Sequence, residues 1–227
     1  MKTTSTDQTH NQSIKKVFVV DDHPVFRDGL VRIVEQMPNL VVCGESDNAV
    51  QALDHISRLC PDLLLVDIGL PGMSGLELMQ NIHSIQPKLP VLVISMHDES
   101  LYALRVLRAG GKGYIMKQAG PEKIMQAITT VMGGRIYASE QTATLALDSI
   151  THTDSAGPHG GVGKLTNREL EIFRLTGQGK DNHQIAQELH ISLKTVDTHR
   201  GNIKEKLDLK SNTEVIHYAV RWTADQS

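Results

Sequence analysis

The sequence predicts an α/β unit built on a parallel sheet, followed by a small unit made only of helices. Short apolar runs alternate with helical patterns over the first half of the chain, which is typical of a parallel sheet covered on both faces. The pattern changes from about Ser139, and only helical signals follow a segment rich in Gly, Ser and Thr. With 227 residues, of which 40% are hydrophobic, the chain can form two units with separate cores.

Five short runs, most of them apolar and β-branched, are the predicted strands, and each ends at a polar or small residue. They are Val17–Val20, Leu40–Cys43, Leu63–Val66, Val91–Ile94 and Gly113–Met116. Helical patterns lie between them, for example over Ala49–Leu59. Parallel neighbours joined in this way require crossover connections, which are right-handed by default.

The second unit is predicted from its helix starts. Thr166 with Glu169, and Ser211 with Glu214, have the spacing of a capping box. Asp181 with Gln184 resembles one, and Ser192 is a candidate cap for the helix that follows. Four short helices are therefore expected, and the preceding segment Asp148–Gly163 reads as a flexible linker.

Composition excludes several classes of protein. The net charge of −3 argues against a bulk polycation. No apolar run approaches the roughly 20 residues of a membrane helix, and the polar Met1–Ser13 lacks the apolar core of a signal peptide. Cys43 and Cys60 are too few for a disulfide framework and are expected to be buried thiols, which indicates a cytoplasmic protein.

Polar residues follow four of the predicted strands at the point where each strand ends. These residues are Asp21 with Asp22, then Asp67, Ser95 and Lys117. In an open α/β sheet, ligands bind beyond the carboxyl ends of the strands, so the side chains are expected to converge. Three close carboxylates repel one another unless a cation joins them, and Mg²⁺ suits such oxygens. The set fits phosphoryl transfer to a carboxylate, with the metal and the lysine neutralising phosphoryl oxygens.

These residues resemble a known family. The segments 17–22, 63–75, 91–95 and 113–117, with their spacings, look like the receiver domain of a two-component response regulator over residues 14–137. The resemblance implies a doubly wound five-stranded parallel sheet of the flavodoxin-like kind. It also implies that a histidine kinase phosphorylates Asp67.

The resemblance further assigns the pocket residues. Asp22, Asp67 and the backbone carbonyl of Gly69 would bind Mg²⁺ directly, and Asp21 would bind it through water. Lys117 would pair with the phosphoryl group, and Ser95 and Tyr114 match the family's switch pair. One position departs from the family, because Gln118 stands where a proline is frequent.

Two of the C-terminal helices have the pattern of a helix-turn-helix. Ile185, Ala186 and Leu189 form one apolar stripe, and Val196, Ile203 and Leu207 form another on a helix over 192–207. The outward face of that helix is expected to enter a DNA major groove, with flanking cations on phosphates. The residues on or beside this face are Lys194, Thr195, Asp197, Thr198, Arg200, Gly201, Lys204, Glu205 and Lys206. A helical bundle with a solvated face is the alternative.

Resemblance again favours DNA binding. Leu165-Thr166, Arg168-Glu169, Thr195-Val196, His199 and Lys206-Leu207 look like the LuxR-type DNA-binding domain, over residues 164–222. The whole chain then resembles a NarL/FixJ-type response regulator, with 1–13 a disordered N-terminus and 138–163 a connecting segment and linker. The family implies that a homodimer binds an inverted repeat, with the last helix at the dimer contact through Val215, Ile216 and Ala219. Asp197 stands where members often carry a cation, so base preference is not transferable.

The predicted activity is a switch rather than a catalytic reaction. A phosphoryl group on Asp67 adds roughly −1.5 to −2 charge, which would move Ser95 and Tyr114. That movement would release the DNA-binding helices, promote dimerisation, or both, and slow loss of the phosphoryl group would time the signal. Three alternatives stay open: a regulator that acts without phosphorylation, a receiver that works as an autophosphatase, and a flavodoxin-like electron carrier.

Overall fold

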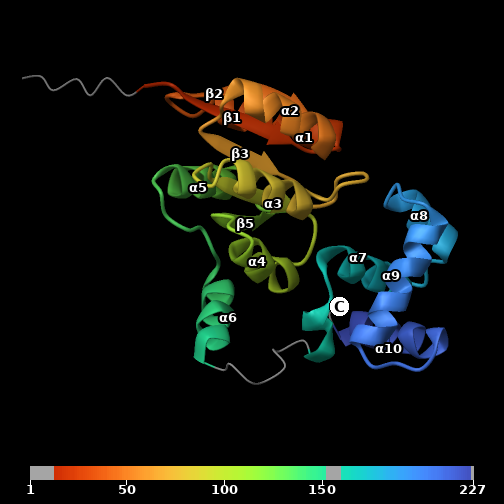
Figure 1. The fold of residues 1–227 in the computed structure, drawn as a ribbon. Helices are drawn as coiled ribbons and strands as arrows, with labels where there is room; N and C mark the ends of the chain where they lie inside the picture. Colours follow the sequence, from red (N-terminus) through yellow and green to blue (C-terminus); the bar gives the residue numbers. More distant parts are fainter. Residues whose placement is uncertain (1–12, 152–159, 226–227) are drawn as a thin grey trace, which may run out of the picture.

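The computed structural model describes residues 13–151 and 160–225 (Figure 1). The proposed disordered N-terminus lies almost entirely outside these residues, as does the middle of the predicted linker. The N-terminal domain is a five-stranded parallel sheet with the strand order β2-β1-β3-β4-β5. Its strands are β1 (Lys15–Val20), β2 (Leu40–Ser46), β3 (Leu63–Val66), β4 (Val91–Ser95) and β5 (Gly113–Met116).

Helices cover both faces of the sheet, and the alternation of side chains along each strand decides which helix they meet. Val17 and Val19 of β1 point into the core formed with α1 (Pro24–Glu35) and α5 (Pro121–Met132). Phe18 and Val20 point into the opposite core, with helices of the other face. Those helices are α2 (Ala49–Leu59), α3 (Gly75–Ile85) and α4 (Glu99–Arg108). The apolar runs of β1, β3 and β4 are therefore buried on both sides, as expected, whereas the edge strand β2 is only partly buried, with Val41 42% exposed.

The C-terminal domain contains the four predicted helices. They are α7 (Asn167–Gly177), α8 (Asn182–Glu188), α9 (Leu193–Lys206) and α10 (Asn212–Asp225). The capping boxes at Thr166 and Asp181 are both complete, and Ser192 caps α9 by accepting from the Thr195 N–H. Phe173 of α7 packs against Tyr218 and Trp222 of α10.

The segment between the domains is more ordered than the sequence indicates. Helix α6 (Glu140–Thr151) was not expected, and it is held to α4 because Glu99 accepts hydrogen bonds from the Thr142 hydroxyl and the Ser139 N–H. The glycines at 160–163 belong to a 3₁₀ helix, η1 (Gly160–Lys164). Val162 within it is buried, so apolar packing orders a glycine-rich stretch that resembles a flexible linker.

The expectation of two buried cysteines is wrong for Cys60. This residue ends α2 in the left-handed conformation and is exposed, whereas Cys43 is half-buried, and both thiols are free. Among the described residues, no helix is long and apolar enough to span a membrane.

Candidate functional site

The carboxyl ends of β1, β3 and β5 bring the predicted pocket residues together. Sheet hydrogen bonding continues one residue past each strand. The Asp21 N–H donates to the Ser46 carbonyl at 3.1 Å, the Asp67 N–H to the Val20 carbonyl at 2.9 Å, and the Lys117 N–H to the Ser95 carbonyl at 2.8 Å. The backbone that carries these side chains is therefore fixed by the sheet. Asp21 and Asp67 are 0% and 4% exposed, so burial holds their carboxylates in place.

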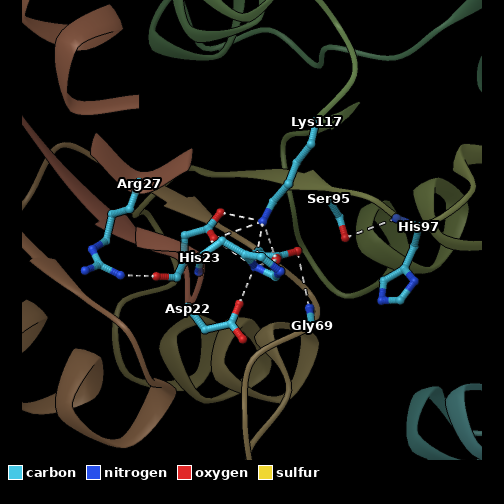
Figure 2. Close-up of polar contacts among 9 residues, drawn as sticks. Asp22, His23, Arg27, Gly69, Ser95, His97 and Lys117 are labelled. Carbon is cyan, nitrogen blue, oxygen red and sulfur yellow. Dashed lines mark hydrogen bonds and ion pairs between the residues drawn. The ribbon is translucent and has the colours of Figure 1, made fainter. Parts of the chain in front are cut away.

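Lys117 joins the carboxylates in this pocket (Figure 2). Its Nζ lies 2.7 Å from Asp67 Oδ2 and 2.9 Å from Asp21 Oδ1, and 4.7 Å from the centre of the Phe26 ring. Burial raises the pKa of the Asp21 carboxyl, and the hydrogen bond from Lys117 opposes that rise. The ammonium thus offsets part of the cost of burying several acidic groups together.

His23 also lies in the pocket, and the sequence analysis missed it. Its Nδ1 is 2.7 Å from Asp22 Oδ1, 3.4 Å from Asp21 Oδ1 and 3.5 Å from Lys117 Nζ (Figure 2). The residue is the N-cap of α1, directly before Pro24. Its place immediately after the aspartate pair was the available signal.

The acidic groups are close enough to share a metal ion. One ligand atom from each of Asp21, Asp22, His23 and Asp67 lies within 4.8 Å of the others. Carboxylate oxygens suit Mg²⁺, and in its absence Asp22 Oδ1 pairs with His23 Nδ1 at 2.7 Å and Asp21 Oδ2 with Lys117 Nζ at 2.8 Å. The donor set therefore fits a divalent cation. Gly69 borders the pocket through its N–H, which donates to Asp67 Oδ1 at 3.3 Å.

The predicted switch residues are buried beside the pocket. Ser95 Oγ accepts the His97 N–H at 3.4 Å, and the Tyr114 hydroxyl donates to the His97 carbonyl at 2.5 Å. The His97 ring stacks on Tyr102 of α4, with 4.8 Å between ring centres. Burial lowers the pKa of His97 to about 4. One loop residue, His97, thus contacts both switch residues and α4, a role the sequence did not indicate.

Helix α9 presents the expected polar face. Lys194, Asp197, Thr198 and Glu205 are exposed, whereas Val196 and Ile203 are fully buried. Asn182 of α8 bridges Asp197 and Arg200 through its side-chain amide, at 2.7 and 2.5 Å. This bridge holds both residues at the junction of the two helices.

One expected DNA contact, Lys206, also has a partner inside the domain. Lys206 Nζ donates to Glu169 Oε2 at 2.7 Å. Although burial raises the pKa of Glu169, hydrogen bonds from Lys206 and Thr166 hold it below its usual value. His199 is half-buried, and burial lowers its pKa. Lys206 therefore stabilises the domain, whatever it contributes on DNA.

Comparisons with known proteins agree with both halves of this description. Residues 17–129 match the response regulator receiver domain, and residues 163–219 match the bacterial regulatory proteins of the LuxR family. Oxygen regulatory protein NreC of Staphylococcus aureus (strain bovine RF122 / ET3-1) is 35% identical over 210 residues, which cover 91% of this chain and 97% of NreC. The chain belongs to the LuxR family of two-component response regulators.

Solved structures show the same fold. A LuxR-family two-component response regulator from Aurantimonas sp. SI85-9A1 is 31% identical, with a TM-score of 0.56 over 61% of this chain and 99% of that one. RcsB from Salmonella enterica serovar Typhimurium, solved bound to promoter rprA with phosphomimetic BeF₃⁻, has a TM-score of 0.61 at 23% identity and covers 91% of this chain and 98% of that one. The expectation of a NarL/FixJ-type response regulator is confirmed, and the electron-carrier alternative falls away.

In this response regulator the receiver contacts the LuxR-type domain through α4 and α7 (Figure 1). Arg105 of α4 donates to the carbonyls of Leu165 and Val162, at 2.7 and 3.2 Å, and to Asn167 Oδ1 at 3.3 Å. In the opposite direction, Arg168 of α7 donates to the carbonyl of Gly72 at 2.6 Å. Two guanidinium groups thus tie the domains together, and nothing in the spacing of the sequence indicated them.

The aromatic side of this contact lies next to the switch residues. Tyr102 is fully buried, and burial raises the pKa of its hydroxyl well above the usual range. The side chain of Arg174 on α7 faces that hydroxyl. Tyr102 therefore stacks on His97 on the receiver side, and its hydroxyl faces Arg174 of the LuxR-type domain.

The structure corrects the predicted dimer contact on α10. Val215 and Ala219 are both 0% exposed because they pack inside the LuxR-type domain, whereas Ile216 is 42% exposed. A fully buried side chain has no surface to offer a second chain. Of the three residues, only Ile216 is placed to meet a partner, and Val220, 46% exposed, lies on the same helix.

Proposed function

We propose that this response regulator controls transcription through phosphorylation of Asp67. A carboxylate oxygen of Asp67 attacks the phosphorus of a phosphohistidine on the kinase. The bond from phosphorus to the imidazole nitrogen breaks, and the imidazole regains its proton. The observation that carries the proposal is the buried Asp67 carboxylate with Lys117 Nζ 2.7 Å away, because a fixed ammonium stabilises charge that builds on phosphoryl oxygens.

Mg²⁺ is the cofactor in this proposal. Asp22, Asp67 and the Gly69 carbonyl would hold it directly, and Asp21 through water. When bound, the ion would neutralise phosphoryl oxygens and orient the incoming group. The three carboxylates and the single ammonium leave the pocket with a formal charge of −2, which favours a divalent cation before a phosphoryl group enters.

The signal passes from the pocket to the output domain through His97. When Ser95 and Tyr114 reorient toward the phosphorylated aspartate, the hydrogen bonds they make to His97 break. The His97 ring then loses its fixed position on Tyr102, whose hydroxyl faces Arg174 of α7. Loosening this stack weakens the contact between α4 and α7 and frees the two domains from each other.

The protein binds an inverted repeat of DNA as a homodimer, and helix α9 of each chain makes the contact. Lys194, Asp197 and Thr198 are exposed even though the receiver is in contact with the LuxR-type domain. The receiver therefore controls where the two DNA-binding domains sit relative to each other and does not cover their outward faces. DNA-bound RcsB, a protein of the same fold, supports this binding mode. A cytoplasmic location is part of the same proposal.

The test compares Asp67→Asn with Asp28→Asn, a substitution at an exposed aspartate of α1. Each protein is incubated with a small phosphodonor and Mg²⁺, and its intact mass is measured. Wild type and Asp28→Asn should gain one phosphoryl group, and Asp67→Asn none. A phosphorylated Asp67→Asn protein would overturn the assignment, and an unmodified wild type would favour a regulator that acts without phosphorylation.

A further inference from the structure

We propose that Asp197 of α9 recognises cytosine in the DNA major groove, and that Asn182 of α8 orients its carboxylate for this contact. The inference rests on the proposed function and deepens it, because it names a base that the DNA-binding helix selects. An ionised carboxylate can only accept hydrogen bonds. In the major groove cytosine presents only a donor, the amino group on C4, whereas adenine carries the acceptor N7 beside its amino group.

Asp197 lies in the part of the helix that meets base edges. Helix α9 begins after its N-cap Ser192, which places Asp197 in the second turn. In helix-turn-helix domains the N-terminal residues of the second helix contact the bases. Asp197 is exposed, as is Lys194 one turn before it, whereas the adjacent Val196 is fully buried. The carboxylate is therefore on the outward face, in the half of α9 that approaches the bases.

The hydrogen bonds of Asn182 determine which carboxylate oxygen is available to DNA. Asn182 Nδ2 donates to Asp197 Oδ1 at 2.7 Å, and Asn182 Oδ1 accepts from Arg200 Nη1 at 2.5 Å. Because arginine can only donate and an ionised aspartate can only accept, the amide has one possible orientation. The bond from Asn182 occupies Oδ1 of Asp197 and leaves Oδ2 to accept from another donor.

The side chain of Asn182 is not needed to begin its own helix. Asp181 is the N-cap of α8, and its capping box with Gln184 is complete. Asn182 instead directs its amide to α9. The Asp197 carboxylate also favours the charged form of Arg200, and these opposite charges offset each other in part. An acidic group on this face is therefore repelled less by DNA phosphates than an isolated carboxylate would be.

Gly201 leaves room for a close approach to DNA. It lies one turn after Asp197 on α9, and a Cβ there would contact nothing within 4 Å beyond its own stretch of helix. Packing inside the domain therefore does not require glycine, a residue that lowers the stability of a helix interior. A side chain as short as aspartate reaches a base only when the helix backbone lies close to the groove floor, and glycine permits that approach.

The test selects binding sites for the full chain from a random pool of double-stranded DNA, after treatment with a small phosphodonor and Mg²⁺. Wild type should select a C·G pair at the same position of each half-site, and changing this pair should lower the affinity about fivefold. Asp197→Asn keeps an acceptor for Asn182 but places an amide NH₂ where Oδ2 stood. This variant should lose the preference for cytosine and select a base with an acceptor at that position.

Two further variants separate recognition from charge and from folding. Glu205→Gln is the matched control, because it removes one negative charge from an exposed residue near the other end of α9, and it should select the same site as wild type. Asn182→Ala should select the same base with a weaker preference, because Asp197 loses the hydrogen bond that orients it. Thermal unfolding of each variant checks that it folds.

An unchanged base preference in Asp197→Asn would overturn the proposal, because the carboxylate would then only join α8 to α9. An equal loss of preference in Glu205→Gln would also overturn it, since the effect would be one of charge. Unchanged selectivity in Asn182→Ala would overturn the role of Asn182. If wild type selects no sequence, the proposed function fails together with this inference. If it selects a site in which Asp197→Asn alters no cytosine, only this inference fails.

Discussion

Replacing Arg105 with alanine should separate the receiver from the LuxR-type domain. The guanidinium reaches across the interface to two backbone carbonyls and one side-chain amide, with its shortest hydrogen bond at 2.7 Å. A hydrogen bond from a charged group contributes about 1.5–3 kcal/mol. Because Arg105 is only half-buried, water replaces part of this hydrogen bonding when the domains separate. The substitution should therefore weaken the contact between the domains by about 2 kcal/mol. That loss corresponds to about a 30-fold shift toward separated domains.

Small-angle X-ray scattering of the unphosphorylated protein measures this shift. Arg105→Ala should have a larger radius of gyration than wild type, and phosphorylation of the wild type should change the curve in the same direction. Arg108→Ala is the matched control, since it removes an exposed arginine of the same helix that makes no hydrogen bond or ion pair to the described part of the LuxR-type domain. If Arg105→Ala and Arg108→Ala both scatter like wild type, the guanidinium does not hold the domains together.

Three further predictions concern the DNA helix, the pocket and pH. Lys194→Ala should weaken DNA binding and reduce its salt dependence, while the thermal stability stays unchanged. Lys206→Ala should weaken DNA binding and also lower the stability, because its ammonium pairs with a buried carboxylate of α7. Calorimetry and a DNA-binding titration distinguish the two variants, and equal stability of both would contradict the pairing. Gly75→Ala should destabilise the receiver by several kcal/mol, on the order of other overpacked sites, since a Cβ there would lie 1.9 Å from the Asp67 carbonyl; a thermal midpoint equal to wild type would refute it. His97, whose pKa is lowered to about 4, is neutral in the folded protein. Between pH 7.5 and pH 5 the free energy of unfolding of wild type should therefore fall by about 1–2 kcal/mol more than that of His97→Gln. Parallel pH curves from denaturant unfolding would show that burial of His97 has no such cost.

Much of the pocket was predictable because the relevant information is local. An unbroken apolar run that ends at Asp21, or at Asp67, gives both the strand and the position of the carboxylate at its end. Since parallel strands share one direction, their carboxyl ends meet at one edge, and convergence follows from topology alone. Caps such as Ser192 are equally local, because the side chain bonds to an N–H only three residues away.

Other features could not be predicted from the sequence, and the reasons are also physical. The segment over Glu140–Thr151 has little apolar content toward its end, and it is held beside α4 through Glu99, which is distant in sequence. The dimer contact on α10 was misassigned in part because an apolar residue on a helix can face either the core or solvent. Only the packing of α7 against α10 showed that Val215 and Ala219 face the core.

The amino-acid sequence by itself determined the two domains, the order of strands and helices along the chain, and the acidic pocket with its lysine, because periodicity, strand ends and caps are properties of neighbouring residues. Only the tertiary structure decided that His23 turns into that pocket and that Arg105 ties α4 to the start of α7. Such contacts join residues far apart in the chain through the directions of their side chains, and those directions are set by packing and burial of the whole molecule.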